Sequence, residues 1–305
     1  MIFSPLGEQG PMIFHGLFRF SVGLPDILNS QKTPFLFWMA GNPVLSIIPV
    51  AVQPRFERFD LGAEVWKAIS KNGAEVLDGD ILVVSSKFAA VSEGRLIDLS
   101  KVKIEDKARL LAEKYHLEPA LAQLVLEESD LVLGGIHGFV LSIVSGTLAP
   151  NAGIDKSNVP KGWAVQYPVD PFKTATDLHR LLLQKASSEG NDLQRLGVVL
   201  SDSRVTPTRL GTIGIAVAYA GMKPTIDMRG TPDLLGNNLA VTLRATADQL
   251  ASAAQLVMGE SNEGRPIVII RGFEEAFSEP KNDFERTTTI APDQCLILSS
   301  MKNPF

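Results

Sequence analysis

The fold class follows from residues 196–203, which read Leu196-Gly197-Val198-Val199-Leu200-Ser201-Asp202-Ser203. Five mostly apolar residues have the length of a strand buried on both faces, and the polar residues after Leu200 predict that the strand ends at 201–203. Residues 81–84, Ile81-Leu82-Val83-Val84, repeat the pattern after the turn-forming Asp78-Gly79. We therefore expect at least two buried strands.

Further predicted elements alternate with these two runs. Strands are expected at residues 46–52, 131–133, 138–144, 213–219, 240–243 and 266–270, and helices at 61–69, 104–115, 118–128, 176–185 and 248–258. This alternation favours a mixed sheet with helices packed on it. The polar residues 145–162 read as a long loop, and loops of that length are usually functional or disordered.

The same features suggest three parts of the chain. Residues 1–44 are rich in Phe, Pro and Gly without a sustained period, and we interpret them as an N-terminal extension of unknown role. Residues 45–273 form the main domain, with a helical insertion at about 104–128. Residues 274–305 are expected to be a C-terminal tail.

Charge and hydropathy exclude several classes of protein. The 305 residues include 29 Lys and Arg against 34 Asp and Glu, a formal net charge of -5, so general nucleic-acid binding is not expected. Residues 34–52 are the most apolar stretch, but Gly41-Asn42-Pro43 and Pro49 interrupt it, so no membrane span is predicted. The first 30 residues do not fit a secretory signal. We expect a cytoplasmic protein.

The composition also limits metal chemistry. Cys295 is the sole cysteine, and the histidines are His15, His116, His137 and His179, none four residues from another. A zinc site built on thiolates or imidazoles is therefore not expected. A bound metal should have oxygen ligands, which favours Mg2+ or Mn2+.

Two acidic segments could supply such oxygens. Residues 151–158, Asn151-Ala152-Gly153-Ile154-Asp155-Lys156-Ser157-Asn158, offer the carboxylate of Asp155 and the amide of Asn158. Ser201-Asp202-Ser203-Arg204 offers a carboxylate and two hydroxyls, and Arg204 and Arg209 could donate paired hydrogen bonds to phosphate. The alternative is that these side chains only bond their own turns or cap a strand, with the arginines in solvent.

Two further segments end regular elements with polar groups. Residues 258–265, Met258-Gly259-Glu260-Ser261-Asn262-Glu263-Gly264-Arg265, follow a predicted helix, and their amides and carboxylates could surround a nucleotide or a cation. Ser85-Ser86-Lys87 follows the strand at 81–84, where Lys87 could pair with a phosphate. The plain alternatives are a helix capped by Gly259 and a solvated lysine. The common phosphate-loop, dinucleotide-binding, nucleophile-elbow and zinc-protease motifs are absent from the sequence.

The order of the segments carries more information than any one of them. The matching pieces are Leu77 to Val84, Glu93-Gly94-Arg95, Asn151 to Asp155 with Ser157-Asn158-Val159, Asp227 to Gly230, Asp233 with Gly236, Val241-Thr242, Ala247-Asp248, Leu256 to Glu260 and Arg271-Gly272. In this order they resemble the coenzyme F420-0:gamma-glutamyl ligase family over about residues 46–273.

This resemblance implies an α+β protein of mixed sheets with packed helices that forms a homodimer. It implies a ligase in which GTP phosphorylates the lactyl carboxylate of F420-0, or of a related compound, and the amine of L-glutamate then displaces phosphate. Mg2+ or Mn2+ ions, expected at two sites, assist by bridging phosphate oxygens.

Matching positions give each candidate residue a role under this resemblance. Asp155 and Asp202 match metal-binding aspartates on which catalysis depends, and Ser203 and Glu260 match the other metal positions. The expected nucleotide-binding residues are Ser86, Lys87, Asn158, Arg204, Arg209, Met258, Gly259, Ser261 and Gly264.

Two places depart from the family pattern. Val91 stands where the family has a lysine. Residues 204–209, Arg204-Val205-Thr206-Pro207-Thr208-Arg209, keep only Pro207 and Arg209 of a Gly-Arg-Pro-x-Arg type sequence. Two alternatives follow: a nucleotide- or deazaflavin-binding protein that has lost or changed ligase activity, and a metal-dependent phosphohydrolase whose acceptor is water.

Overall fold

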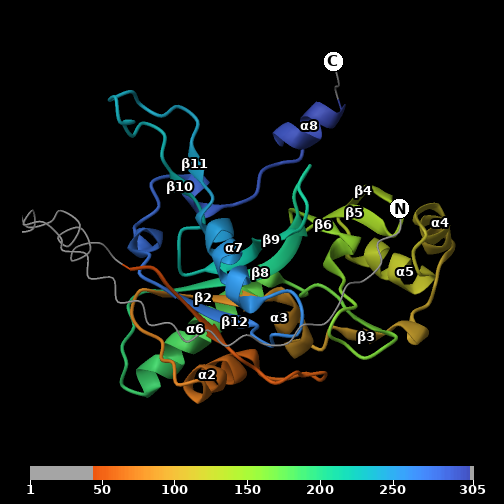
Figure 1. The fold of residues 1–305 in the computed structure, drawn as a ribbon, viewed down its shortest axis with the longest axis horizontal. Helices are drawn as coiled ribbons and strands as arrows, with labels where there is room; N and C mark the ends of the chain where they lie inside the picture. The colour runs from red at the N-terminus through yellow and green to blue at the C-terminus, as the bar shows by residue number, and fades with distance from the viewer. Residues whose placement is uncertain (1–43, 303–305) are drawn as a thin grey trace, which may run out of the picture. The chain divides into compact units, whose positions relative to one another are not determined.

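The computed structural model describes residues 44–302 (Figure 1). The predicted N-terminal extension, residues 1–44, lies outside the described residues except for Val44. The segment 274–302, expected as a tail, belongs to the same compact unit as the sheet.

A five-stranded sheet forms the centre of this unit and confirms the predicted α+β class with a mixed sheet. Its strands lie in the order β1 (Ser46–Val50), β12 (Ile267–Arg271), β2 (Asp80–Ser85), β8 (Leu196–Val205) and β9 (Thr212–Ala220). Within this sheet β2 and β8 are parallel, with Val83 beside Val199, and the other neighbours are antiparallel. The two buried apolar runs of the sequence therefore lie side by side, and the polar residues that follow each run are brought to the same edge of the sheet.

Alternate residues of the central strands pack against helices on opposite faces. Leu82 belongs to the cluster formed with α2 (Leu61–Lys71) and α6 (Pro171–Ser188), whereas Val83 packs with residues of α7 (Thr246–Met258). In Figure 1, α7 lies above the sheet, and α2 and α6 lie below it. Burial on both faces explains why β2 is apolar without alternation.

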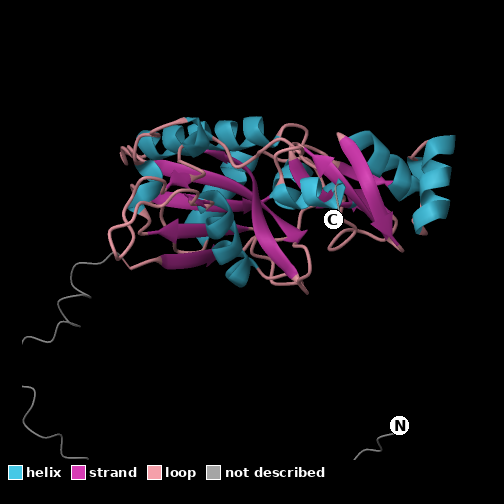
Figure 2. Ribbon diagram, turned by 90° about the horizontal axis from the view of Figure 1, so that it is seen from above, coloured by secondary structure: helices cyan, strands magenta, loops and turns pink. Residues whose placement is uncertain are grey.

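A smaller region lies between α3 (Ser86–Ser92) and α6 in the sequence, and Figure 2 shows it beside the main sheet. Its elements are β3 (Leu96–Asp98), η2 (Leu99–Lys101), α4 (Asp106–Tyr115), α5 (Pro119–Glu128), β4 (Leu131–Ile136), β5 (Phe139–Val144), β6 (Thr147–Pro150), η3 (Asn151–Gly153) and β7 (Trp163–Val165). The strands β4, β5 and β6 form an antiparallel sheet, and β3 pairs with β7. The two helices predicted here are confirmed.

The C-terminal segment contacts β10 (Ile226–Asp227), the strand from which residues 228–242 extend as a long arm (Figure 1). The arm begins at β10 and returns at β11 (Leu243–Arg244), and the segment then forms η4 (Glu274–Phe277), η5 (Asp283–Arg286) and α8 (Leu296–Lys302). Glu285 is fully buried and accepts a hydrogen bond from the Asp227 N–H at 3.0 Å. The tail residues therefore help to hold β10 in place.

Several local predictions were wrong. β8 does not end at residues 201–203, because β9 continues to pair with it as far as Val205 after a bulge between Leu200 and Ser201. The stretch 145–162 is not one loop, since it contains β6 and η3.

The element ends also differ from expectation. The predicted strand 240–243 is reduced to the pairing of Leu243 and Arg244 in β11. The helix expected at 176–185 begins earlier, at Pro171, because the Asp170 side chain caps it and proline suits the first turn. Across residues 44–302, no helix has both the length and the apolar character needed to cross a membrane.

Candidate active site

A cavity of about 780 Å³ opens where β2 ends beside Ser201 of β8. Its walls come from α3, from the segment around residues 150–160, from residues 201–205 of β8 and from residues 255–266 at the end of α7 and beyond it. The four polar segments that the sequence singled out separately therefore surround one space.

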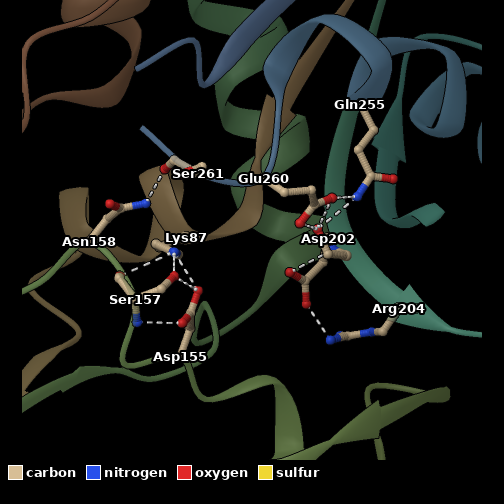
Figure 3. A network of polar contacts seen from close by, with 10 residues as sticks. Lys87, Asp155, Ser157, Asn158, Asp202, Arg204, Gln255, Glu260 and Ser261 are labelled. Atoms are coloured by element: carbon tan, nitrogen blue, oxygen red, sulfur yellow. Dashed lines mark hydrogen bonds and ion pairs between the residues drawn. The ribbon is translucent and has the colours of Figure 1, made fainter. Parts of the chain in front are cut away.

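Three carboxylates from distant parts of the chain line this cavity together (Figure 3). Asp155 follows η3, Asp202 lies on β8, and Glu260 lies in the loop after α7. The sequence-based hypothesis required that these side chains share one pocket. The structure brings all three to it.

The Asp155 carboxylate is held by several donors. Its backbone exchanges hydrogen bonds with Val165 of β7 at 3.0 and 2.8 Å. The carboxylate accepts from the Ser157 N–H at 2.6 Å and the Ser157 hydroxyl at 2.9 Å, and it forms an ion pair with Lys87 (Figure 3). Burial raises the pKa of Asp155, but the Lys87 charge and the Ser157 donors outweigh it, so the pKa lies below its usual value. Asp155 is therefore a charged carboxylate.

The turn before Asp155 has an unusual backbone that fixes its direction. Asn151, Ala152 and Gly153 have φ values of 47°, 55° and 72°, all in the left-handed region. The Asn151 side chain accepts the Val140 N–H at 2.9 Å, and a Cβ at Gly153 would come within 2.9 Å of the Tyr167 ring. Glycine is therefore required at 153 for both conformation and space.

Asp202 and Arg204 lie two residues apart on β8, so their side chains emerge on the same face. They form an ion pair, and the carboxylate also accepts the Ser203 N–H at 3.0 Å (Figure 3). Arg204 is only 4% exposed and lies 5.5 Å from the centre of the Tyr167 ring. Burial raises the pKa of Asp202 above its usual value, although the Arg204 charge acts in the opposite direction. The cation beside Asp202 is therefore enclosed by the protein.

Ser203 and Glu260 form a second polar pair, and Gln255 contacts both of its members. Figure 3 shows Gln255 beside Glu260. The Ser203 hydroxyl lies 3.1 Å from each carboxylate oxygen of Glu260. Gln255 donates to the Ser203 hydroxyl at 2.9 Å and also to Glu260. The three side chains join β8 to the end of α7.

The loop after α7 faces Asn158 across the cavity. The Asn158 side chain donates to the Ser261 carbonyl at 2.6 Å (Figure 3). Gly259 ends α7 with φ 77°, and Gly264 has φ 64° and accepts the Val52 N–H at 2.9 Å through its carbonyl. Asn158, Met258, Gly259, Ser261 and Gly264 all line the cavity, as the sequence predicts for nucleotide-binding positions. Their contact with a nucleotide stays a prediction.

Two predicted residues lie elsewhere. Arg209 is exposed in the turn between β8 and β9 and does not line the cavity. Ser86 is buried at the start of α3 and does not line the cavity, although its neighbours Ser85 and Lys87 do.

The structure adds lining residues that the sequence did not indicate. Gln255 precedes Met258 by three positions, so helical spacing places both on one side of α7. Arg55 also lines the cavity and pairs with Glu64 at 2.6 Å, and Arg265, which belongs to the segment 258–265 that the sequence singled out, lines it too. The spacing around Met258 could have revealed Gln255, but the irregular segment that holds Arg55 carries no comparable pattern.

Val91, the departure from the family lysine, lines the cavity as part of a small apolar cluster with Ala90 and Val165. Lys87 lies four residues earlier in α3, which is one helical turn, so both side chains are on the same helix face. An ammonium group is therefore present on this wall despite the valine.

The charges around the cavity balance. Among the described residues, the acidic lining side chains are Asp155, Asp202, Glu260 and Glu263, and the basic ones are Arg55, Lys87, Arg204 and Arg265. Four charges of each sign give a formal sum of zero. A polyanionic ligand would therefore need additional cations to neutralise it.

Comparison with known proteins gives the family of the chain. Residues 56–272 match the family model described as F420-0:gamma-glutamyl ligase. A protein named coenzyme F420:L-glutamate ligase from Methanothermobacter thermautotrophicus is 38% identical over 215 residues, which cover 70% of this chain and 83% of the relative. A protein of the same name from Methanopyrus kandleri is 34% identical over 247 residues, 80% of this chain and 94% of the relative. The chain therefore belongs to the F420-0:gamma-glutamyl ligase family, whose members are enzymes that form carbon–nitrogen bonds.

Proposed function

We propose that the protein joins L-glutamate to the lactyl carboxylate of coenzyme F420-0, or of a related compound, with GTP as the phosphoryl donor and two Mg2+ or Mn2+ ions. The observation that carries this proposal is the meeting of Asp155, Asp202 and Glu260 on one cavity. The names of the relatives support the glutamate and F420 substrates. The homodimer and the cytoplasmic location stay predictions.

The cavity suits a nucleotide in size and in polarity. A volume of about 780 Å³ lies within the usual range for small-molecule sites. Because the lining charges sum to zero, the negative charge of a triphosphate needs divalent cations for compensation. A triphosphate bound here would therefore bring divalent cations with it, as phosphoryl transfer requires.

The donor set fits a hard divalent cation, because carboxylates and a hydroxyl are oxygen ligands. Asp155 and Asp202 would hold one ion, and Ser203 with Glu260 would contribute to the second. Across residues 44–302, no three His, Cys, Asp or Glu side chains already form a metal-binding group. Binding of the ions therefore requires the side chains to rearrange, and above all the Lys87 ammonium to leave Asp155.

The reaction consists of two transfers. An oxygen of the acceptor carboxylate attacks the γ-phosphorus of GTP, the bond to the β-phosphate oxygen breaks, and GDP leaves. The glutamate amine then attacks the acyl carbon, phosphate leaves with the bonding electrons, and the amine loses a proton. Bound divalent ions would supply charge neutralisation at the phosphates.

The side chains of this protein position the reactants for both steps. Asn158 and the loop 258–265 would orient the nucleotide, and Lys87 and Arg265 would offer ammonium and guanidinium donors to phosphate oxygens. Val91 and the neighbouring apolar residues form a wall that limits water, which would otherwise hydrolyse an acyl phosphate.

The decisive experiment incubates purified protein with GTP, Mn2+, L-glutamate and F420-0 and measures GDP and glutamylated product by mass spectrometry. The proposal expects both products, with GDP formation dependent on the acceptor. Tight GTP binding without turnover on several carboxylates would instead support a nucleotide-binding protein. Phosphate release from GTP without any acceptor would support a phosphohydrolase.

A further inference from the structure

The two aspartates of the cavity have partners of very different exposure. Asp202 is paired with Arg204, whose side chain is 5% exposed and packed against Tyr167. Asp155 is paired with Lys87, whose side chain is 29% exposed and lines the cavity. Arg204 reaches the cavity wall but is almost fully buried against Tyr167, whereas Lys87 is more exposed and has a flexible four-carbon stem that can turn into the cavity.

Lys87 occupies the place that a cation at Asp155 would take. Besides its ion pair with Asp155, its ammonium donates to the Ser157 hydroxyl at 2.8 Å and to the Ser157 carbonyl at 3.3 Å. The group of ligands is thus one carboxylate, one hydroxyl and one carbonyl, all oxygens. Hard divalent cations bind oxygens of the same three kinds. An ammonium and a divalent ion cannot occupy this position together.

We propose that Lys87 is a placeholder cation that neutralises Asp155 in the metal-free enzyme and moves to a nucleotide phosphate when a divalent ion binds Asp155. This inference rests on the proposed function. The exchange keeps the half-buried carboxylate paired in both states, and it adds a cation to the nucleotide only when metal is present. Metal and nucleotide therefore bind cooperatively, because each favours the position of Lys87 that the other needs.

If this exchange occurs, removing the Lys87 ammonium should strengthen the binding of Mn2+ and weaken the binding of the nucleotide. In Lys87→Met, the metal no longer competes with an internal cation, so Mn2+ alone should bind roughly tenfold more tightly, the effect expected for loss of one charge-assisted bond. A non-hydrolysable GTP analogue at saturating Mn2+ should bind more weakly, because its phosphate loses a partner. A lysine that only stabilised the loop would weaken both.

Lys156 provides the matched control. It is adjacent to Asp155 in the sequence, but its ammonium pairs with Glu118 at 2.7 Å and does not line the cavity. Lys156→Met removes the same charge from the residue next to Asp155 and should change Mn2+ affinity less than twofold. Lys87→Arg keeps a cation beside Asp155 and should bind Mn2+ as weakly as the wild-type protein does.

The test measures Mn2+ binding to the nucleotide-free protein by electron paramagnetic resonance of free Mn2+, with analogue binding by calorimetry. A gain in Mn2+ affinity in Lys87→Met that disappears in the Lys87→Met/Asp155→Asn double variant supports the exchange. Mn2+ affinity in Lys87→Met that is equal to or lower than that of the wild-type protein and of Lys87→Arg overturns it. If wild-type protein makes the glutamylated product while this gain is missing, only the placeholder role fails. If the gain appears without product, only the ligase function fails.

Discussion

The Ser203 hydroxyl lies 3.1 Å from both carboxylate oxygens of Glu260, although the two residues are 57 positions apart. This contact joins β8 to the loop after α7 and aligns the two side chains expected at a second cation. Gln255 donates to both members of the pair and so fixes their orientation. A side chain that orients metal ligands contributes to metal affinity without touching the metal.

Gln255→Ala should therefore weaken metal-dependent ligation. We expect the KM for Mn2+ to rise roughly tenfold, because the loss of an orienting hydrogen bond typically lowers metal affinity by that factor or more. Steady-state kinetics at varied Mn2+ would measure the change. Gln249→Ala is the control, since Gln249 is an exposed residue of the same helix outside the cavity. Equal kinetics in the two variants would show that Gln255 does not orient the metal ligands.

Replacing the two aspartates should have different effects on stability. Asp202→Ala leaves the buried Arg204 guanidinium without its carboxylate, so we expect a loss of about 3 kcal/mol in the free energy of unfolding. Asp155→Ala should lower it by less than about 1 kcal/mol, because Lys87 can reach solvent. Both variants should lose turnover, and urea unfolding monitored by circular dichroism separates the two cases. Similar unfolding midpoints would contradict the enclosed pair at Asp202.

Arg265 and Arg209, two of the arginines considered as phosphate donors, should be distinguishable by kinetics. Arg265 lines the cavity, whereas Arg209 is exposed outside it. Arg265→Ala should raise the KM for GTP roughly tenfold, since a charged donor to phosphate is lost. Arg209→Ala should stay within about twofold of wild type. The reverse order would restore the phosphate role that the sequence suggested for Arg209.

The two central strands, β2 and β8, could be predicted from the sequence because residues 81–84 and 196–200 are buried on both faces. Residues 81–84 and 196–200 are continuous apolar runs, and that pattern is specific to such strands. The extension of β8 to Val205 could not be predicted, since the polar residues 201–203 are held in the strand by pairing with β9. Pairing between distant residues leaves no local signal in composition.

The carboxylates of the site could be singled out from the sequence, but their partners could not. Asp155 and Asp202 stood out because each lies among small polar residues in a segment of recognisable order. The pairing of Asp155 with Lys87 joins residues 68 positions apart and depends on how α3 faces the turn after η3. Only the tertiary structure shows that the partner of Asp202 is almost fully buried and that the partner of Asp155 is partly exposed.

The contacts between β10 and the C-terminal segment predict a loss of stability in acid. Arg229 and Asn282 donate to Asp227 and hold its pKa well below the usual value. Burial raises the pKa of Glu285, but the N–H groups of Lys281 and Asp227 and the Lys223 ammonium bring it below the usual value.

Because both carboxyl groups have lower pKa values in the folded state, their contribution is present above about pH 4 and is lost as the pH falls toward the folded-state pKa values. The Tm of the wild-type protein should therefore decrease between pH 5 and pH 3, and Asp227→Asn should reduce that decrease. Asp283→Asn, which removes an exposed charge from η5 beside β10, should keep the wild-type slope. Differential scanning calorimetry across this range would reject the coupling if Asp227→Asn and Asp283→Asn showed the same dependence on pH.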